Sequence, residues 1–195
     1  MEEEEGKESE ASGEESRMIE RFLKTRTILA CEPISDKLAR RMYQGLLLLE
    51  DADPDKVITI IVNSPGGDAD SGFGIMDMIR FVKCPIRTLV AGLCASAGVL
   101  VALAADKDQR FSLPNSRFLL HQPMTATFGQ ASDLEIASME ILKLRDAYNQ
   151  VVVEVTGKDL AQVTRDADRD FWMSAQEALE YGLLTRVITS RQELE

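Results

Sequence analysis

The chain has 195 residues, of which 45% are hydrophobic and 28% charged, and its formal net charge is −11. This length and composition are typical of one soluble globular domain, and the acidic balance without a basic stripe argues against a nucleic-acid partner. Three cysteines with no paired spacing argue against a disulfide framework and favour a reducing, cytoplasmic location. A single histidine argues against a metal site built from His and Cys.

The first segment, residues 1–16, is a low-complexity stretch of Glu, Ser and Gly. It contains eight Glu and one Lys, a balance of −7. Such a segment cannot bury enough apolar surface to fold, so we expect a disordered acidic tail, either simply solvated or used for interaction. Residues 17–195 are expected to form the folded domain.

Strand and helix signals alternate through the first half of the domain. In chain order, the predicted elements are a strand at 27–30, an amphipathic helix opened by Ser35, a buried strand at 57–62, a helix carrying Phe73, Met76, Ile79 and Val82, a strand at 86–91 and a buried helix at 99–105. The β-branched run at 57–62 is typical of a parallel strand. It ends in Asn-Ser-Pro-Gly-Gly at 63–67, which predicts a sharp turn with an exposed backbone.

The stretch 92–98, Gly-Leu-Cys-Ala-Ser-Ala-Gly, joins the strand at 86–91 to the helix at 99–105. It places the hydroxyl of Ser96 where a strand turns into a helix, among residues small enough for another backbone to approach. The first free N–H groups of that helix, beginning at Ala97, favour negative charge beside Ser96. These are the conditions that a nucleophile with an oxyanion donor requires.

Two other interpretations fit the same residues. Ser96 can be a serine that simply packs inside a hydrophobic segment. Residues 88–105 also carry no charge and are long enough for a membrane span. Gly92, Ser96 and Gly98 near the middle of that segment argue against a span, and we expect no membrane partner.

The second half begins with two short strands, at 110–113 and 117–120, and the second of these delivers His121. The capping-box pattern of Ser132 and Glu135 predicts the start of a long helix that Gly157 ends. Apolar residues recur along this helix at alternating steps of three and four, a seam of the kind that meets another copy. The seam consists of Leu134, Ala137, Ile141, Leu144, Tyr148 and Val151.

A second capping box, Ser174 with Glu177, predicts a shorter helix that Gly182 stops. The apolar pair at 187–188 suggests a final strand. Because strands and helices alternate throughout, we expect an α/β domain with mainly parallel pairing.

A nucleophilic serine needs a base, and His121 is the only histidine in the chain. An orienting carboxylate must come later in the sequence. Composition and spacing leave four candidates open: Asp133, Asp166, Asp168 and Asp170. The order Ser, His, Asp matches none of the three familiar triad orders, and Cys94 stands where a G-x-S-x-G elbow has its first glycine.

Five motifs together resemble the Clp protease proteolytic subunit (ClpP) family, from about Ile19 to the C-terminus. They are Asn63-Ser64-Pro65-Gly66-Gly67, Ala95-Ser96-Ala97-Gly98, His121-Gln122-Pro123, Asp168-Arg169-Asp170 with Ser174-Ala175-x-Glu177-Ala178, and Tyr181-Gly182-Leu183. The resemblance implies a serine endopeptidase with Ser96 as nucleophile, His121 as general base and Asp170 as the orienting acid. It also implies that Gly67 and Ala97 supply the N–H groups of the oxyanion hole.

The same resemblance implies a crotonase-like fold of repeated β-β-α units, with a long protruding helix that docks two rings. The family's particles are two stacked heptameric rings, a tetradecamer that degrades unfolded polypeptides in protein quality control. An AAA+ unfoldase of the Clp type feeds them, and it, not this chain, uses ATP; no cofactor or metal is expected here. By resemblance, Ile141 and Leu144 lie on the docking helix, and Asp168 and Arg169 form a contact between subunits.

The chain departs from the family pattern at three places. Ala97 stands where the family usually has Met, Met124-Thr125-Ala126 replaces a common Leu-Gly-Gly, and the Glu-rich tail replaces an apolar axial loop. Two further interpretations stay open: a non-catalytic ring subunit that pairs with an active ClpP paralogue, and a crotonase-type acyl-CoA enzyme.

Overall fold

A computed structural model describes residues 20–194; the acidic segment 1–16, expected to be disordered, lies outside the described residues. A seven-stranded sheet organises the described chain, with strand order β1-β2-β3-β4-β7 and with β5 pairing to both β3 and β6. The strands are β1 (Thr27–Ala30), β2 (Ile58–Ser64), β3 (Ile86–Ala95), β4 (Arg110–Ser112), β5 (Arg117–Leu120), β6 (Phe171–Ser174) and β7 (Arg186–Val187).

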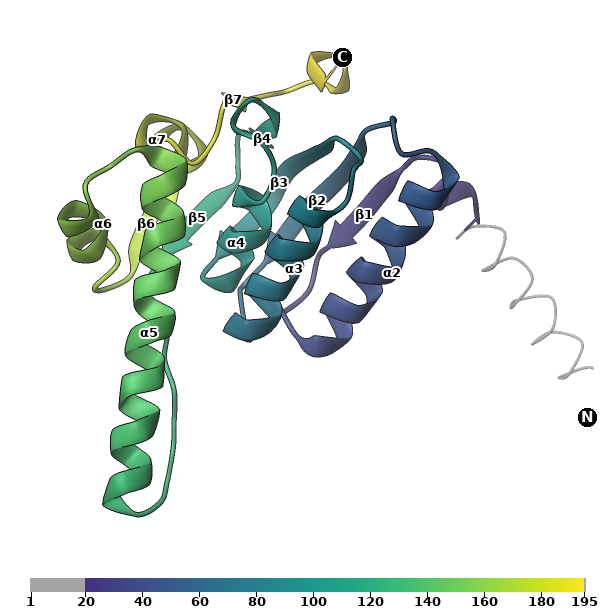
Figure 1. Ribbon diagram of the computed structural model, residues 1–195. Coiled ribbons are helices and arrows are strands. Elements are labelled where there is room, and N and C mark those ends of the chain that lie inside the picture. Colours follow the sequence, from purple (N-terminus) through teal and green to yellow (C-terminus); the bar gives the residue numbers. More distant parts are fainter. Residues whose placement is uncertain (1–19, 195) are drawn as a thin grey trace, which may run out of the picture.

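All the pairs are parallel except β5 with β6, so the expected α/β class with mainly parallel pairing is confirmed. The α-helices are α2 (Asp36–Ala52), α3 (Ala69–Phe81), α4 (Ala97–Leu103), α5 (Ala131–Thr156), α6 (Leu160–Asp166) and α7 (Ala175–Tyr181). Helices α2, α3 and α4 lie side by side against one face of the sheet (Figure 1).

Strand β3 is longer than the sequence predicts, because it continues past Ala91 to Ala95. Its first part pairs with β4 through Thr88–Val90, and its last part pairs with β5 through Leu93–Ala95. Gly92, with a φ of +120°, lies between the two parts. The change of partner carries the end of β3 to β5, the strand that ends just before His121.

The buried helix after Ser96 is confirmed, although it begins two residues earlier than predicted. Every residue of α4 is buried, because the helix lies between the sheet and its neighbouring helices. Segment 88–105 is therefore divided between β3, a turn and α4. Across residues 20–194, the structure contains no helix that combines the length and apolar character needed to cross a membrane.

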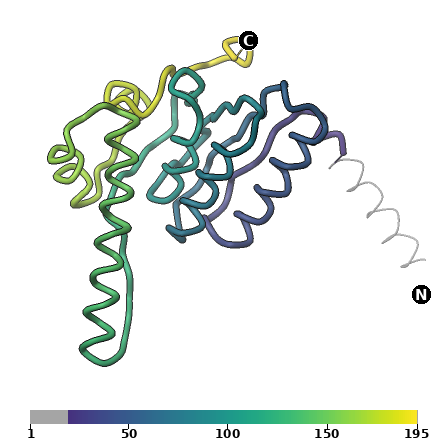
Figure 2. Tube along the Cα trace, viewed as in Figure 1, coloured from purple at the N-terminus to yellow at the C-terminus, as the bar shows by residue number. Residues whose placement is uncertain are grey.

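Helix α5 runs from Ala131 to Thr156, and about half of it projects from the body of the molecule (Figures 1 and 2). The predicted capping box at its start is wrong: the N-cap is Gln130, which makes no side-chain capping bond, so Ser132 already lies in the first turn. The predicted end is confirmed, since Gly157 adopts the left-handed conformation after the last turn. The second capping box, Ser174 with Glu177, is also confirmed, with both of its hydrogen bonds formed.

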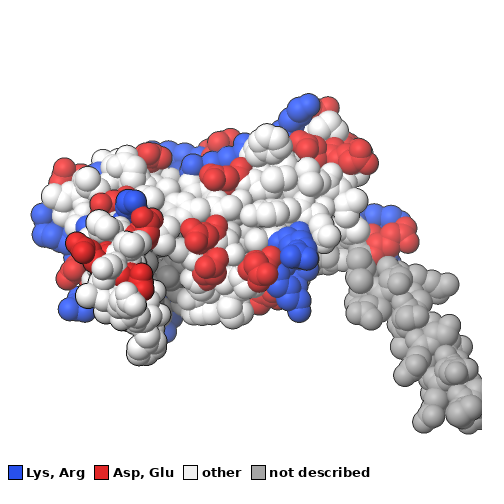
Figure 3. All heavy atoms as spheres, turned by 60° about the horizontal axis from the view of Figure 1, so that its bottom comes forward, with Lys and Arg blue, Asp and Glu red and all other residues white. Residues whose placement is uncertain are grey.

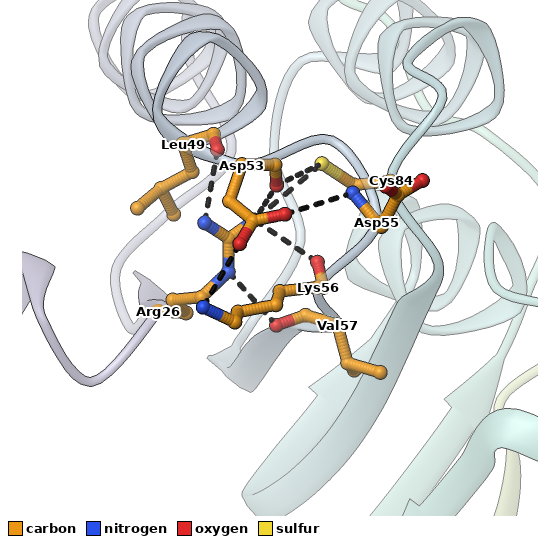
Figure 4. Close-up of polar contacts among 7 residues, drawn as sticks. All are labelled: Arg26, Leu49, Asp53, Asp55, Lys56, Val57 and Cys84. Atoms are coloured by element: carbon orange, nitrogen blue, oxygen red, sulfur yellow. Dashed lines mark hydrogen bonds and ion pairs between the residues drawn. The ribbon is translucent and has the colours of Figure 1, made fainter.

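Arg26 ties the start of the domain to the end of α2 (Figure 4). Its guanidinium donates hydrogen bonds to four backbone carbonyl oxygens, those of Leu49 (3.0 Å), Asp53 (2.9 Å), Lys56 (2.9 Å) and Val57 (3.3 Å). Leu49 lies in the last turn of α2 and Asp53 is its C-cap, whereas Lys56 and Val57 lie in the segment that leads into β2. The contact positions β1 beside β2 at the edge of the sheet.

On the face shown in Figure 3, acidic and basic side chains are interspersed over the body of the molecule. No continuous basic area crosses this face of the described chain. Nucleic-acid binding relies on a continuous basic area, and the face drawn in Figure 3 lacks this feature.

Candidate active site

Ser96 occupies the turn between β3 and α4, in a backbone conformation that non-glycine residues rarely adopt. Its φ is +53° and its ψ is −127°. The backbone N–H of Ser96 donates to the carbonyl of Leu119 in β5 at 3.0 Å, and the N–H of Val99 donates to the Ser96 carbonyl at 2.9 Å. A strained conformation persists only where surrounding contacts hold it, and such strain concentrates at functional sites.

The two glycines of the turn after β2 allow close contact with Ser96 and with Ile34. Gly66 has a φ of +88°, and a Cβ atom there would lie 2.6 Å from the Cβ of Ser96. Gly67 has a φ of +147° and forms a parallel bridge with Ile34, whose carbonyl oxygen a Cβ would strike. Glycine is therefore required at both positions. Gly67 lines the same pocket as Ser96.

Replacing Gly67 with alanine should destabilise the protein strongly, because the new methyl group meets backbone atoms that cannot move aside. Gly157→Ala is the matched control: its φ is +71°, but nothing lies within 4 Å of the added Cβ. That variant should lose only the left-handed strain energy of about 1–2 kcal/mol. Thermal unfolding of both variants measures the difference. An equal loss at the two positions would contradict the close packing of Gly67 on Ile34.

His121 and Asp170 are brought together by the pairing of β5 with β6. The last pair of this antiparallel ladder is Leu120 with Phe171, so the next residues outward, His121 and Asp170, face each other. The Nδ1 atom of His121 lies 3.5 Å from an Oδ1 atom of Asp170; the imidazole is 16% exposed and the carboxylate 65%. This contact orients the ring and leaves Nε2 for another partner.

The other three candidate carboxylates have different surroundings. Asp166 accepts a hydrogen bond from the hydroxyl of Tyr181 at 2.8 Å. The side-chain amide of Gln122 donates hydrogen bonds to Asp168, to its backbone carbonyl oxygen at 2.8 Å and to its carboxylate at 3.4 Å. Asp133 lies in the first turn of α5. Within residues 20–194, Asp170 is the one of the four whose carboxylate contacts the His121 ring.

A pocket of about 530 Å³ is lined by four of the five candidate active-site residues, all except Asp170. Ser96, Ala97, His121 and Gly67 all line it. Its apolar walls come from three helices and the segment after β5, and include Phe73, Leu100, Pro123, Met124, Ile141, Leu144 and Tyr148. No hydrogen bond joins Ser96 to His121 among the described residues, although both side chains face this pocket; such contacts are often long in unliganded enzymes.

Cys94, two residues before Ser96, is the other potential nucleophile in this turn. It is fully buried, and burial raises the pKa of its thiol well above the ordinary range. A buried thiol in apolar surroundings is unreactive. Of the two potential nucleophiles in this turn, the hydroxyl of Ser96 is therefore the one that lines the pocket.

The residues expected at subunit contacts lie in two places. Ile141 and Leu144 are half-buried and form part of the pocket wall rather than the outer face of α5. Asp168 and Arg169 are exposed in the turn between α6 and β6, and Arg169 makes no ion pair with residues 20–194. The seam pattern assigned Tyr148 only to the apolar side of the helix. In the structure its hydroxyl also donates a hydrogen bond to the carbonyl oxygen of Ser96, a contact that the sequence did not predict.

An α/β sheet that presents a serine at a strand–helix turn, beside a His–Asp pair and a helix N-terminus, defines a serine hydrolase. The family model described as "Clp protease" matches residues 9–191. The chain is 47% identical over 180 residues to the ATP-dependent Clp protease proteolytic subunit 2 of Treponema pallidum. This alignment covers 92% of this chain and 90% of the relative. It is 43% identical over 189 residues to subunit 3 of Rhizobium meliloti, with coverage of 97% and 92%.

Among solved structures, the chain is similar to a point mutant of ClpP1 from Listeria monocytogenes. The TM-score is 0.85 and the sequence identity 39%, and the match covers 91% of this chain and 99% of that one. The chain belongs to the Clp protease family and has the ClpP fold. It is a proteolytic subunit with the activity of a ClpP-type serine peptidase.

Proposed function

We propose that Ser96, His121 and Asp170 form a catalytic triad that hydrolyses peptide bonds of unfolded proteins. The observation that carries this proposal is the β5–β6 register, which sets Asp170 against Nδ1 of a histidine that shares a pocket with Ser96. His121 Nε2 takes the proton of the Ser96 hydroxyl as Oγ attacks the peptide carbonyl. The tetrahedral intermediate then collapses, His121 protonates the leaving amine, and an acyl-serine forms.

Water then hydrolyses the acyl-serine, and His121 again acts first as general base and then as general acid. His121 takes a proton from water, the hydroxyl attacks the acyl carbon, and Ser96 recovers its proton as the carboxylate product leaves. The N–H groups of Gly67 and Ala97 stabilise the oxyanion in both halves. The chain supplies every group in this scheme, so the proposal includes no metal and no cofactor, and ATP is used by a partner.

Labelling with a fluorophosphonate probe, followed by peptide mapping and native mass measurement, tests this proposal. The probe should modify Ser96 alone, in particles of one defined size. A non-catalytic ring subunit would assemble without being labelled. A crotonase-type acyl-CoA enzyme would hydrolyse or rearrange thioesters and would leave peptides intact.

We further propose that α5 docks two heptameric rings into a tetradecamer, either of this chain alone or mixed with a ClpP paralogue. The relatives are named as numbered subunits of an ATP-dependent protease. Large apolar side chains remain exposed on the projecting half of α5, as the docked face of such a helix would require. They are Leu134, Ile136, Met139 and Leu142.

The remaining partners follow from the same family membership. Asp168 and Arg169, both exposed, are proposed to pair across the interface between rings. An AAA+ unfoldase of the Clp type is proposed to deliver unfolded polypeptides. A cytoplasmic location is supported by three free cysteines, one of them exposed.

Ile136→Glu should dissociate the double ring, because a carboxylate would be buried without a partner at the contact, at a cost of several kcal/mol per copy. Ile136 is 55% exposed in the single chain, so the fold itself should survive. Gln192→Glu, at an exposed position in the C-terminal segment and not on α5, adds the same charge as the control. Native mass and circular dichroism give the readout.

Ile141→Glu and Leu144→Glu make a second comparison. The resemblance predicts that they too would give single rings, but these side chains also line the pocket. They should therefore lower peptide hydrolysis beyond any change in assembly. Full-size particles from both Ile136→Glu and Ile141→Glu would show that α5 does not dock the rings.

A further inference from the structure

The hydroxyl of Tyr148 connects the middle of α5 to the backbone of the nucleophile turn. Tyr148 is 6% exposed, and its hydroxyl donates a hydrogen bond to the carbonyl oxygen of Ser96 at 3.3 Å. The same oxygen accepts the N–H of Val99 at 2.9 Å. A carbonyl oxygen has two lone pairs, so both bonds can form together.

This carbonyl belongs to the peptide unit whose N–H is that of Ala97. A peptide unit is planar and trans, so its C=O and N–H groups point in opposite directions. Whatever fixes the Ser96 carbonyl therefore fixes the direction of the Ala97 N–H, which lies at the pocket and starts α4. A hydrogen bond to the carbonyl also polarises the N–H and makes it a better donor.

The unit needs such support because its first residue is strained. Ser96 has a φ of +53°, which the L-configuration disfavours. Burial raises the pKa of the Tyr148 phenol well above its ordinary value, with desolvation as the largest cause. The phenol therefore stays protonated at physiological pH, and its proton is available to the Ser96 carbonyl.

We propose that Tyr148 is a positioning residue that holds the Ser96–Ala97 peptide so that the Ala97 N–H points at the developing oxyanion. This inference rests on the proposed function, because it assigns the Ala97 N–H to the oxyanion hole. Tyr148 itself does not touch the reacting atoms. Since Tyr148 lies on α5, the contact also makes the geometry of the oxyanion donor depend on the position of that helix.

Tyr148→Phe tests the proposal, because it removes one hydroxyl and keeps the ring. The kcat for an unstructured peptide should fall between about twofold and tenfold, the range that one net hydrogen bond represents, while KM changes little. The inhibition constant of a peptide boronate, which mimics the tetrahedral intermediate, should rise by the same factor as kcat/KM falls. Rates are expressed per site titrated with a fluorophosphonate, so that unfolded protein does not count.

Two further variants complete the design. Tyr148→Met also lacks a donor and should show the same loss in boronate affinity. Tyr43→Phe is the matched control: this half-buried tyrosine lies between α2 and α3, with its hydroxyl against Gly74 and away from the pocket. Its kinetics should equal those of the parent.

The outcomes separate the possible errors. Parent-like kcat and boronate affinity in Tyr148→Phe, with only a lower unfolding temperature, would overturn the proposal and leave a structural tyrosine. A change in KM alone would also overturn it and make Tyr148 a pocket contact. A parent protein that neither hydrolyses peptides nor labels at Ser96 would refute the proposed function instead.

Discussion

Ser96→Ala is expected to abolish peptide hydrolysis, with a rate loss on the order of 10⁴-fold or more. Of the two potential nucleophiles in the turn between β3 and α4, the Ser96 hydroxyl lines the pocket, whereas Cys94 beside it is fully buried. Alanine adds no volume to the turn, so particles of unchanged mass and circular dichroism should form. The measurement is hydrolysis of an unstructured peptide over a period long enough to detect residual turnover.

Cys94→Ala is the control for the Ser96 variant. Removal of this buried thiol should cost some stability through a small cavity, but the hydrolysis rate per folded site should stay close to that of the parent. If Ser96→Ala still cleaves the peptide at nearly the parent rate, Ser96 is not the nucleophile. Loss of activity in Cys94→Ala alone would point to the thiol.

Asp170→Asn is expected to reduce hydrolysis by a factor of about 10⁴, because an amide in place of the carboxylate favours the wrong tautomer of the base. The Nδ1 atom of His121 lies 3.5 Å from Asp170 Oδ1. In the proposed mechanism this contact keeps the proton on Nδ1 and leaves Nε2 free to accept the proton of Ser96. With asparagine, the amide would hold the imidazole with its proton on Nε2.

Asp166→Asn gives the matched comparison on the same segment. Asp166 accepts the Tyr181 hydroxyl at 2.8 Å, and an asparagine carbonyl can accept that bond equally well. Its hydrolysis rate should therefore change by no more than a few fold. Equal losses in the two variants would mean that the assignment of Asp170 is wrong and that the loop acts as one structural unit.

Local chemistry was sufficient to predict several parts of the fold and site. The turn 63–67 requires its glycines because their backbone approaches Ser96 and Ile34, and the pattern of Pro and paired Gly already indicated a sharp turn. The capping box of Ser174 and Glu177 forms with both bonds. Such features depend on residues close together in sequence, and the pattern of residues specifies them directly.

Some local predictions failed where several alternatives were close in energy. Ser132 has the right spacing to Glu135 for a capping box, yet α5 begins at Ala131. The first turn of a helix frays easily, and its start depends on the incoming chain as well as on the cap. Strand β3 likewise runs past Ala91, because Leu93–Ala95 find a partner in β5.

The sequence by itself determined the strand–helix alternation, the small-residue turn around Ser96 and His121 as the one histidine available for a base, because each follows from short-range periodicity, turn chemistry or a single available residue type. The family resemblance pointed to Asp170, and the tertiary structure shows the contact of its carboxylate with His121. Four aspartates were open by spacing, and the antiparallel register of β5 with β6 brings Asp170 to the imidazole. The tertiary structure also decided that Tyr148 contacts Ser96 and that Ile141 and Leu144 face the pocket. These contacts join segments that are distant in the sequence, and their approach depends on how α5 packs against α4.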